Sequence, residues 1–254
     1  MTRPMLAALG ALVLLAAGAA AQQPEAPAAA TPREQAPLDV TGDWVSVVTE
    51  DWRWRMVLPR KGDYSSVPLS EEGRTVADTW DPAMLASDGC KAYGAAAIMR
   101  VPGRLRVAWQ DEATLRIETD AGLQTRYLRF GAANEAPAER TWQGHSTAQW
   151  GVIRQPGGLG VSLQTAPPRM GALAVVTMNL RAGYLRSNGV PYSEDTVVTE
   201  HFDVVHAYGT DWLTVLAVVE DRRYLNQAFI TSSHFRREPD ASNWMPRPCE
   251  PAVD

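Results

Sequence analysis

Short runs of β-prone residues, separated by turn residues, follow one another from residue 38 onward, and they restrict the possible folds more than any other feature. Runs rich in Val, Thr, Leu and Trp are typical of strands. We predict strands at 41–49, 52–58, 105–109, 114–119, 123–130, 141–153, 173–180, 196–205, 212–220 and 229–237. About ten strands with so little helix favour an all-β fold over any α/β arrangement. The expected architecture is an antiparallel barrel or a barrel-like sandwich with one short helix.

The one helix is predicted at 70–80. Ser70 is a suitable N-cap residue, and Glu71 and Glu72 place negative charge in the first turn, where the helix dipole favours it. The helical pattern ends at Asp81-Pro82. A tight turn is predicted at 120–122, because Gly122 can adopt the left-handed conformation of a three-residue hairpin loop.

The first 21 residues have the composition of a secretory signal peptide. Arg3 precedes an apolar stretch at 5–17, and the alanines at 19–21 match the small-residue rule for cleavage before Gln22. We expect a flexible leader rich in Ala, Pro and Gln at 22–37, and a single β-rich domain at 38–254. The protein is therefore expected to be periplasmic or secreted. No second long apolar run follows, so no membrane span is expected after cleavage.

Charge and cysteine content narrow the possible partners and the compartment. The formal net charge of −5 argues against nucleic acid, whose phosphates require clustered Lys and Arg. Cys90 and Cys249 are the only two cysteines, and their spacing is not that of a C-x-x-C redox motif. In an oxidising compartment the simplest interpretation is one structural disulfide between them.

The segment 52–58 alternates between apolar and charged residues, as a strand with two different faces does. One face carries Trp52, Trp54, Met56 and Leu58, and the other carries Asp51, Arg53 and Arg55. If the charged face lines a cavity, its guanidinium groups would bind a carboxylate, phosphate or sulfate through paired hydrogen bonds. If it faces water, the segment is an ordinary amphipathic strand whose Trp face belongs to the core.

The first predicted strand begins with Gly42-Asp43-Trp44, which resembles the G-x-W signature of lipocalins and related calycin barrels. In that family the Trp closes the base of the barrel, and a basic residue from the last strand packs over it. The resemblance implies a calycin-like barrel in which Arg236 or Arg237 contacts Trp44 through a cation–π interaction.

Other segments resemble a broad family of exported bacterial β proteins to which no activity is assigned. These segments are Trp142-Gln143-Gly144-His145-Ser146 with Trp150, Asn188-Gly189-Val190-Pro191-Tyr192-Ser193, Glu200-His201-Phe202 and Val219-Glu220-Asp221. The resemblance implies an exported β fold and no particular chemistry.

Three residues are candidates for acid–base catalysis. His145 with Glu200 or His201 would form a proton-transfer pair if their strands are neighbours. The histidines show neither the H-x-H nor the H-E-x-x-H spacing of metal sites, so we predict no metal and no cofactor.

The leading hypothesis is a protein that binds a small, partly apolar ligand with a polar or anionic group. The candidate ligand-binding residues are Asp51, Arg53, Arg55, Arg100, Trp142, Tyr184 and Tyr192. Trp and Tyr side chains would form the walls of a cavity in the barrel, and the arginines would hold the charge. Two alternatives remain open: a cofactor-free hydratase, lyase or isomerase on the same barrel, and an envelope interaction module with no small ligand.

Overall fold

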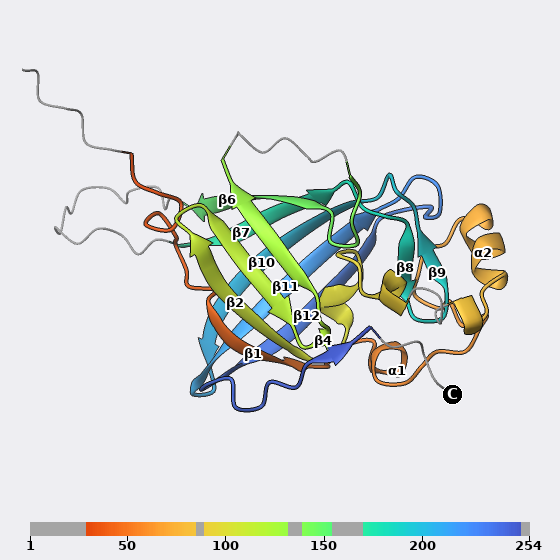
Figure 1. The fold of residues 1–254 in the computed structure, drawn as a ribbon, viewed down its shortest axis with the longest axis horizontal. Helices are drawn as coiled ribbons and strands as arrows, with labels where there is room; N and C mark the ends of the chain where they lie inside the picture. The colour runs from red at the N-terminus through yellow and green to blue at the C-terminus, as the bar shows by residue number, and fades with distance from the viewer. Residues whose placement is uncertain (1–28, 85–88, 132–138, 154–169, 250–254) are drawn as a thin grey trace, which may run out of the picture.

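A computed structural model describes residues 29–84, 89–131, 139–153 and 170–249, and it shows a closed β-barrel (Figure 1). In this described part of the chain, the barrel strands are β1 (Gly42–Val47), β2 (Arg104–Asp111), β3 (Thr114–Thr119), β5 (Thr125–Phe130), β6 (His145–Ile153), β7 (Met170–Met178), β10 (Val197–Ala207), β11 (Thr210–Glu220) and β12 (Phe229–Glu238). The prediction of an all-β barrel is confirmed.

The order around the barrel is β1, β12, β11, β10, β7, β6, β5, β3 and β2. β1 pairs with both β12 and β2, and this double pairing closes the cylinder. Neighbouring strands are antiparallel, except that β5 and β6 run parallel to each other.

Two groups of elements gather at the end of the barrel where β1 finishes, which we call the lid end (right in Figure 1). The first group follows β1 and contains α1 (Trp52–Arg55), α2 (Glu71–Asp78) and the 3-10 helices η1 (Gly89–Ala92) and η2 (Ile98–Arg100). The second is the hairpin of β8 (Gly183–Arg186) and β9 (Val190–Tyr192). Among the described residues, no helix combines the length and the apolar character needed to cross a bilayer.

Apolar side chains from alternating strand positions fill the barrel. Leu115, Leu173 and Leu213 are fully buried in this core, and Ile98 and Met99 of η2 enter it from the lid end. The sequence had suggested a cavity walled by indole rings, with guanidinium groups turned inward. The structure differs: Trp44 is the fully buried indole of the core, and the predicted anchors Arg55 and Arg100 come from lid elements.

The predicted strand at 52–58 is wrong, because residues Trp52–Arg55 form the single helical turn α1. Trp52 and Met56, four residues apart, both point outward and are 64% and 59% exposed. Arg55 points inward, where it pairs with Glu50 and donates a hydrogen bond to the carbonyl oxygen of Arg100. A buried guanidinium group needs such partners, and the segment therefore forms a helical turn that places Arg55 beside them, although its sequence alternates like a strand.

The contact implied by the G-x-W motif is present. The guanidinium carbon of Arg237, on β12, lies 4.3 Å from the centre of the Trp44 ring. Arg237 also donates a hydrogen bond to the carbonyl oxygen of Thr41. Gly42 has a φ of 123°, and a Cβ atom there would lie 2.2 Å from an Arg237 nitrogen, so the glycine makes room for the stacked guanidinium group.

The predicted helix is confirmed, and Gly122 has the predicted left-handed conformation, but the connection runs from residue 120 to 124 and is longer than the three-residue loop expected. Ser70 Oγ accepts a hydrogen bond of 3.0 Å from the backbone N–H of Gly73 at the start of α2. Gly122 has a φ of 77° in the connection between β3 and β5. It belongs to the two-residue strand β4 (Ala121–Gly122), which pairs with β13 (Arg247–Pro248).

Residues 31–41, which we call the strap, lie at the opposite end of the barrel from the lid. Trp150 donates a hydrogen bond of 2.7 Å to the carbonyl oxygen of Pro32. The backbone N–H of Arg33 donates to the carbonyl oxygen of Glu112, and its guanidinium group pairs with the Glu112 carboxylate, each at 3.2 Å. Contact with the barrel therefore begins before residue 38, inside the segment predicted as a leader. The predicted signal peptide lies outside the described residues.

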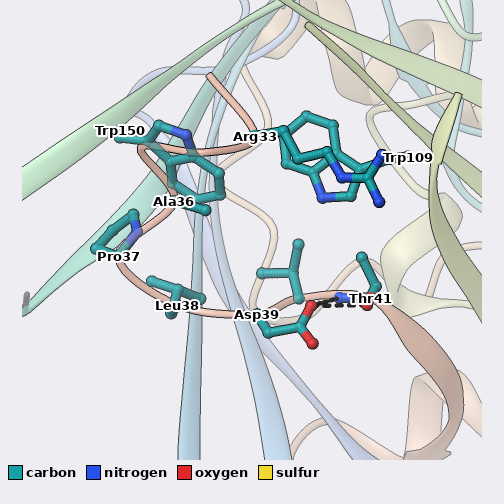
Figure 2. Close-up of a pocket in the computed structure, with 9 residues that line it drawn as sticks. Arg33, Ala36, Pro37, Leu38, Asp39, Thr41, Trp109 and Trp150 are labelled. Atoms are coloured by element: carbon teal, nitrogen blue, oxygen red, sulfur yellow. Dashed lines mark hydrogen bonds between the residues drawn. The ribbon is translucent and has the colours of Figure 1, made fainter. Parts of the chain in front are cut away.

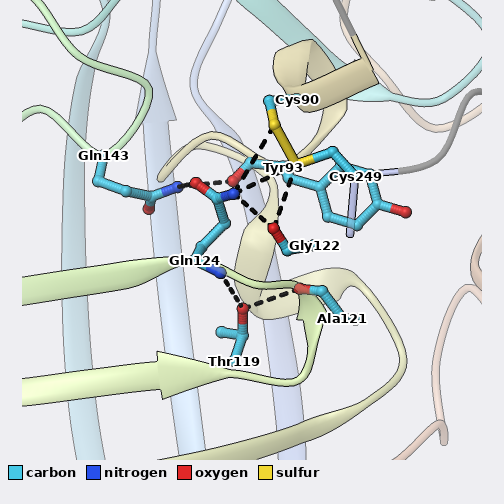
Figure 3. The surroundings of a disulfide bond; sticks show 8 residues. All are labelled: Cys90, Tyr93, Thr119, Ala121, Gly122, Gln124, Gln143 and Cys249. Atoms are coloured by element: carbon cyan, nitrogen blue, oxygen red, sulfur yellow. Dashed lines mark hydrogen bonds between the residues drawn. A yellow bond between two sulfur atoms is a disulfide. The ribbon is translucent and has the colours of Figure 1, made fainter. Parts of the chain in front are cut away.

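The disulfide between Cys90 and Cys249 is present and joins η1 to the end of β13 (Figure 3). Cys249 Sγ lies 3.1 Å from the carbonyl oxygen of Gly122. Gln124 Nε2 lies 3.2 Å from the same sulfur and donates to the Gly122 carbonyl, while Gln124 Oε1 accepts a hydrogen bond from Gln143. The bridge thus fixes the C-terminal segment to η1, and the contacts of Cys249 with Gly122 and Gln124 hold it beside the turn between β3 and β5.

Replacing Cys90 with Ser should lower the free energy of unfolding by about 4 kcal/mol, because the bridge closes a loop of 159 residues. The measurement is urea unfolding followed by circular dichroism, with and without reductant. In reductant the variant and the wild type should coincide. A variant that is as strongly destabilised relative to wild type in reductant would contradict this account.

Asp221, directly after β11, holds together the connections at the lid end. Its carboxylate accepts hydrogen bonds from Thr196 Oγ1 at 2.6 Å and from the backbone N–H groups of Ser193, Arg223 and Tyr224 at 2.5 to 2.9 Å. Burial raises the pKa of this carboxyl, but the hydrogen bonds lower it by more, so the pKa lies below its ordinary value.

A depressed pKa in the folded state means that the stabilisation is complete above the unfolded pKa of about 3.9 and is lost as the pH falls through the folded value. Asp221→Asn should therefore cost about 1–3 kcal/mol at pH 7, with the difference from wild type shrinking towards pH 3. Urea unfolding at pH 7, 5 and 3 measures this. The exposed Asp195→Asn is the control and should show no such trend; a constant deficit in Asp221→Asn would refute the linkage.

Candidate functional site

Three buried arginines converge at the lid end. Arg55 comes from α1, Arg100 from η2 and Arg186 from the end of β8, and their exposed fractions are 9%, 7% and 4%. Arg100 is the central member, because its charge lowers the pKa of both Arg55 and Arg186. We call these three residues the arginine cluster.

Two members of the arginine cluster have carboxylate partners. Arg55 forms an ion pair with Glu50, and Arg100 Nη2 lies 2.9 Å from Asp51 Oδ2. The guanidinium carbon of Arg100 also lies 5.1 Å from the centre of the Phe229 ring. The pKa of Arg55 is lowered mainly by burial, and its attraction to Glu50 opposes that shift.

Arg186 has only neutral hydrogen-bond acceptors among the described residues. It donates hydrogen bonds of 2.8 Å to the carbonyl oxygen of Ser65 and to Ser66 Oγ. Its guanidinium carbon lies 4.8 Å from the centre of the Trp54 ring. Burial, reinforced by repulsion from Arg100, lowers the pKa of Arg186 to about 10.

The arginine cluster therefore carries more positive than negative charge. Its three guanidinium groups contact two carboxylates, those of Glu50 and Asp51. Asp63 also attracts Arg186, but it is paired with Arg53, so an excess of one positive charge remains. Nη2 of Arg55, Nη1 of Arg100 and Nε of Arg186 are buried and have no hydrogen-bond partner in the part of the chain that the structure describes. Buried charges are normally paired, so this arrangement is suited to receiving an anion.

Arg53, the remaining predicted arginine, lies outside the cluster. Its side chain is 62% exposed and pairs with Asp63 at 2.6 Å, and it lies 5.3 Å from the centre of the Trp54 ring. The neighbouring indole N–H of Trp54 and the positive charge of Arg53 lower the pKa of the Asp63 carboxyl. The predicted charged face of Asp51, Arg53 and Arg55 is therefore divided: the Arg55 guanidinium group is buried, and that of Arg53 is in water.

A second buried polar group crosses the barrel interior below the lid. Arg126 of β5 and Glu200 of β10 form a bidentate ion pair at 3.1 and 2.5 Å, and they are 1% and 0% exposed. Thr177 of β7 accepts a hydrogen bond of 3.3 Å from Arg126, and its hydroxyl lies 2.8 Å from that of Ser146 on β6. Four adjacent strands each supply one side chain to this network.

The predicted proton-transfer pair is not brought together. β7 lies between β6, which carries His145, and β10, which carries Glu200 and His201. Glu200 points inward to Arg126, whereas His201 is exposed on the outer face. His145 is buried at the start of β6, and its Nε2 atom has no hydrogen-bond partner among the described residues.

The predicted aromatic residues lie near the lid but have other neighbours. The Trp142 ring has the guanidinium carbon of Arg181 4.2 Å from its centre. Tyr192 is fully buried, and burial raises the pKa of its hydroxyl. Tyr184 is half-buried, and burial raises its pKa as well.

Arg126 was missing from the predicted site residues. The sequence pattern could have revealed it, because Arg126 alternates with Leu128 and Phe130 and therefore shares the inward face of β5 with them. Arg186 is next to the predicted Tyr184 and Tyr192, in a turn region that the sequence had indicated as able to close over a ligand.

No group of three or more His, Cys, Asp or Glu side chains with metal-binding geometry occurs within the described ranges. No protein-family model and no curated protein sequence matches this chain.

Replacing Arg126 with Met should destabilise the protein by about 3–5 kcal/mol, because Glu200 would remain buried without a counter-charge. The double variant Arg126→Met/Glu200→Leu should recover most of that loss. Urea unfolding of the wild type, both single variants and the double variant gives the coupling energy. A double variant as unstable as Arg126→Met would contradict the ion-pair interpretation.

Proposed function

We propose that this protein binds a small, partly apolar ligand through an anionic group, and that Arg55, Arg100 and Arg186 hold that group. The observation that carries the proposal is the excess of buried positive charge in the arginine cluster. Each of its three guanidinium groups also has a buried nitrogen without a partner in the described structure. A carboxylate or a phosphate monoanion would supply both the missing charge and the missing acceptors.

Aromatic rings beside the arginine cluster supply apolar surface for the rest of the ligand. Trp54 lies against Arg186, and Phe229 lies against Arg100. Guanidinium groups stacked on aromatic rings keep their N–H edges free for an anion. The apolar part of the ligand would pack against these rings.

Entry of the ligand requires part of the lid to move, since the free nitrogens are buried. α1 is the element best suited to this movement. It is a single turn, its N-cap residue Asp51 makes no side-chain cap, and Trp52 and Met56 project into solvent. We expect α1 to shift while the barrel stays closed.

The test is isothermal titration calorimetry with two probes that share an alkyl chain, decanoate and decanol. Decanoate should bind at least about tenfold more tightly than decanol, a difference of about 1.4 kcal/mol. Arg186→Met and Arg100→Met should each weaken decanoate binding by about tenfold or more and leave decanol unaffected. Arg60→Met, a change at an exposed arginine in the same connection, is the matched control and should bind like wild type.

Thermal unfolding of the same variants provides a second criterion. Removing an uncompensated buried cation is neutral or stabilising, whereas breaking a structural ion pair is destabilising. Arg186→Met should therefore keep or raise the melting temperature while it loses the ligand. Equal affinity for decanoate and decanol, or unchanged affinity in both cluster variants, would refute the proposal.

The enzyme alternative has weaker support. It needs a base and an acid in contact, and Glu200 is occupied by Arg126 while His201 faces outward. The interaction-module alternative gains from Arg53, Trp52 and Met56, which are exposed at α1. Arg53→Ala should leave folding intact, and we expect it to weaken decanoate binding less than the changes at Arg100 and Arg186.

A further inference from the structure

The strap end of the barrel contains a pocket of about 440 Å³, which is within the range of small-molecule sites (Figure 2). Trp109 of β2 and Trp150 of β6 form one side of it. Leu38, Asp39 and Thr41 of the strap form the opposite side, and Arg33 lies next to the indole rings. The pocket is at the other end of the barrel from the arginine cluster.

The two indoles present their ring surfaces to the pocket, and the N–H of Trp150 is not available to a ligand. Trp109, Phe130 and Trp150 form one aromatic group, with ring centres 5.2 to 6.4 Å apart. The N–H of Trp150 is used by the carbonyl oxygen of Pro32. A ligand would therefore meet this side of the pocket mainly through apolar contact with flat rings.

The pocket has two charged side chains: Arg33 can donate hydrogen bonds to a ligand, and Asp39 can accept one. Arg33 uses one guanidinium nitrogen for Glu112, and a guanidinium group has further N–H donors. Both hydrogen bonds that Thr41 donates to Asp39 go to Oδ1, so Oδ2 remains an acceptor for a ligand. Glu112 already balances the charge of Arg33, so Asp39 leaves the pocket with a negative excess that disfavours an anionic ligand.

We infer that this pocket binds a saccharide, with one pyranose ring packed against the inclined indole rings of Trp109 and Trp150. A pyranose ring has an apolar face of C–H groups and a rim of hydroxyls. Its hydroxyls would donate to Asp39 Oδ2 and accept from Arg33. A neutral aromatic compound would use the indoles alone and leave both charged groups without a new partner.

The strap gives the pocket its shape. Thr31 and Arg33 are both bound to Glu112, and Pro32 is bound to Trp150. These contacts keep the strap over the ends of β2 and β6, so the acceptor of Asp39 stands opposite the rings.

Ligand-observed saturation-transfer NMR with chitotriose, cellotriose and maltotriose tests the inference, and indole serves as the aromatic probe. At least one trisaccharide should bind with a dissociation constant of about 1 mM or lower. Asp39→Ala, a change at an exposed residue, should weaken that binding by about tenfold, and Trp109→Leu should abolish it. If Trp109→Leu fails to fold, Asp39→Ala alone decides.

Two controls separate this site from the arginine cluster. Trp52→Leu removes an exposed indole at the lid end and should leave saccharide binding unchanged. Arg186→Met should lose decanoate and keep the saccharide, so each site can fail without the other. The inference is overturned if none of the three saccharides binds at about 10 mM, if indole binds more tightly than all of them, or if Asp39→Ala binds like wild type.

Discussion

Closure of the barrel through β1 is the constraint on which the rest of the structure depends. β1 pairs with β12 on one side and with β2 on the other, so no strand edge is left between them. The stack of Arg237 on Trp44 lies at this junction and ties the start of β1 to the end of β12. The wall is closed and most of the middle is filled by apolar side chains, with the Arg126–Glu200 pair as a polar exception, and the two proposed binding sites lie at the two ends.

Two groups of buried charges, one in the lid and one just below it, differ in their charge balance. Below the lid, Arg126 and Glu200 form a neutral ion pair, although Arg126 Nε also lacks a partner in the described structure. In the lid itself, the arginine cluster has more cations than carboxylates and keeps three nitrogens without partners in the described structure. The two groups therefore differ in net charge and not in the presence of unpartnered nitrogens, and the proposed ligand site rests on that excess of positive charge.

Much of the fold could be predicted because strand patterns are local. The alternation around Leu115 and Ile117, the cap at Ser70 and the left-handed Gly122 each depend on a few neighbouring residues. The segment at 52–58 failed for the opposite reason: its conformation depends on Glu50 and on the carbonyl oxygen of Arg100, which is 45 residues away from Arg55. Likewise, the pairing of His145 with Glu200 depended on strand order, and the sequence does not reveal that β7 separates them.

The parallel pair of β5 and β6 has a consequence for the barrel as a whole. A closed ring with an odd number of strands cannot alternate direction all the way round, so two like-directed strands must meet somewhere. Here they share a ladder of three residue pairs, against nine between β6 and β7, which makes this seam the weakest line along the wall. The ion pair between Arg126 and Glu200 joins strands on opposite sides of that seam. The buried ion pair therefore connects β5 to β10 through the interior of the barrel, and it opposes separation of β5 from β6 at their short ladder.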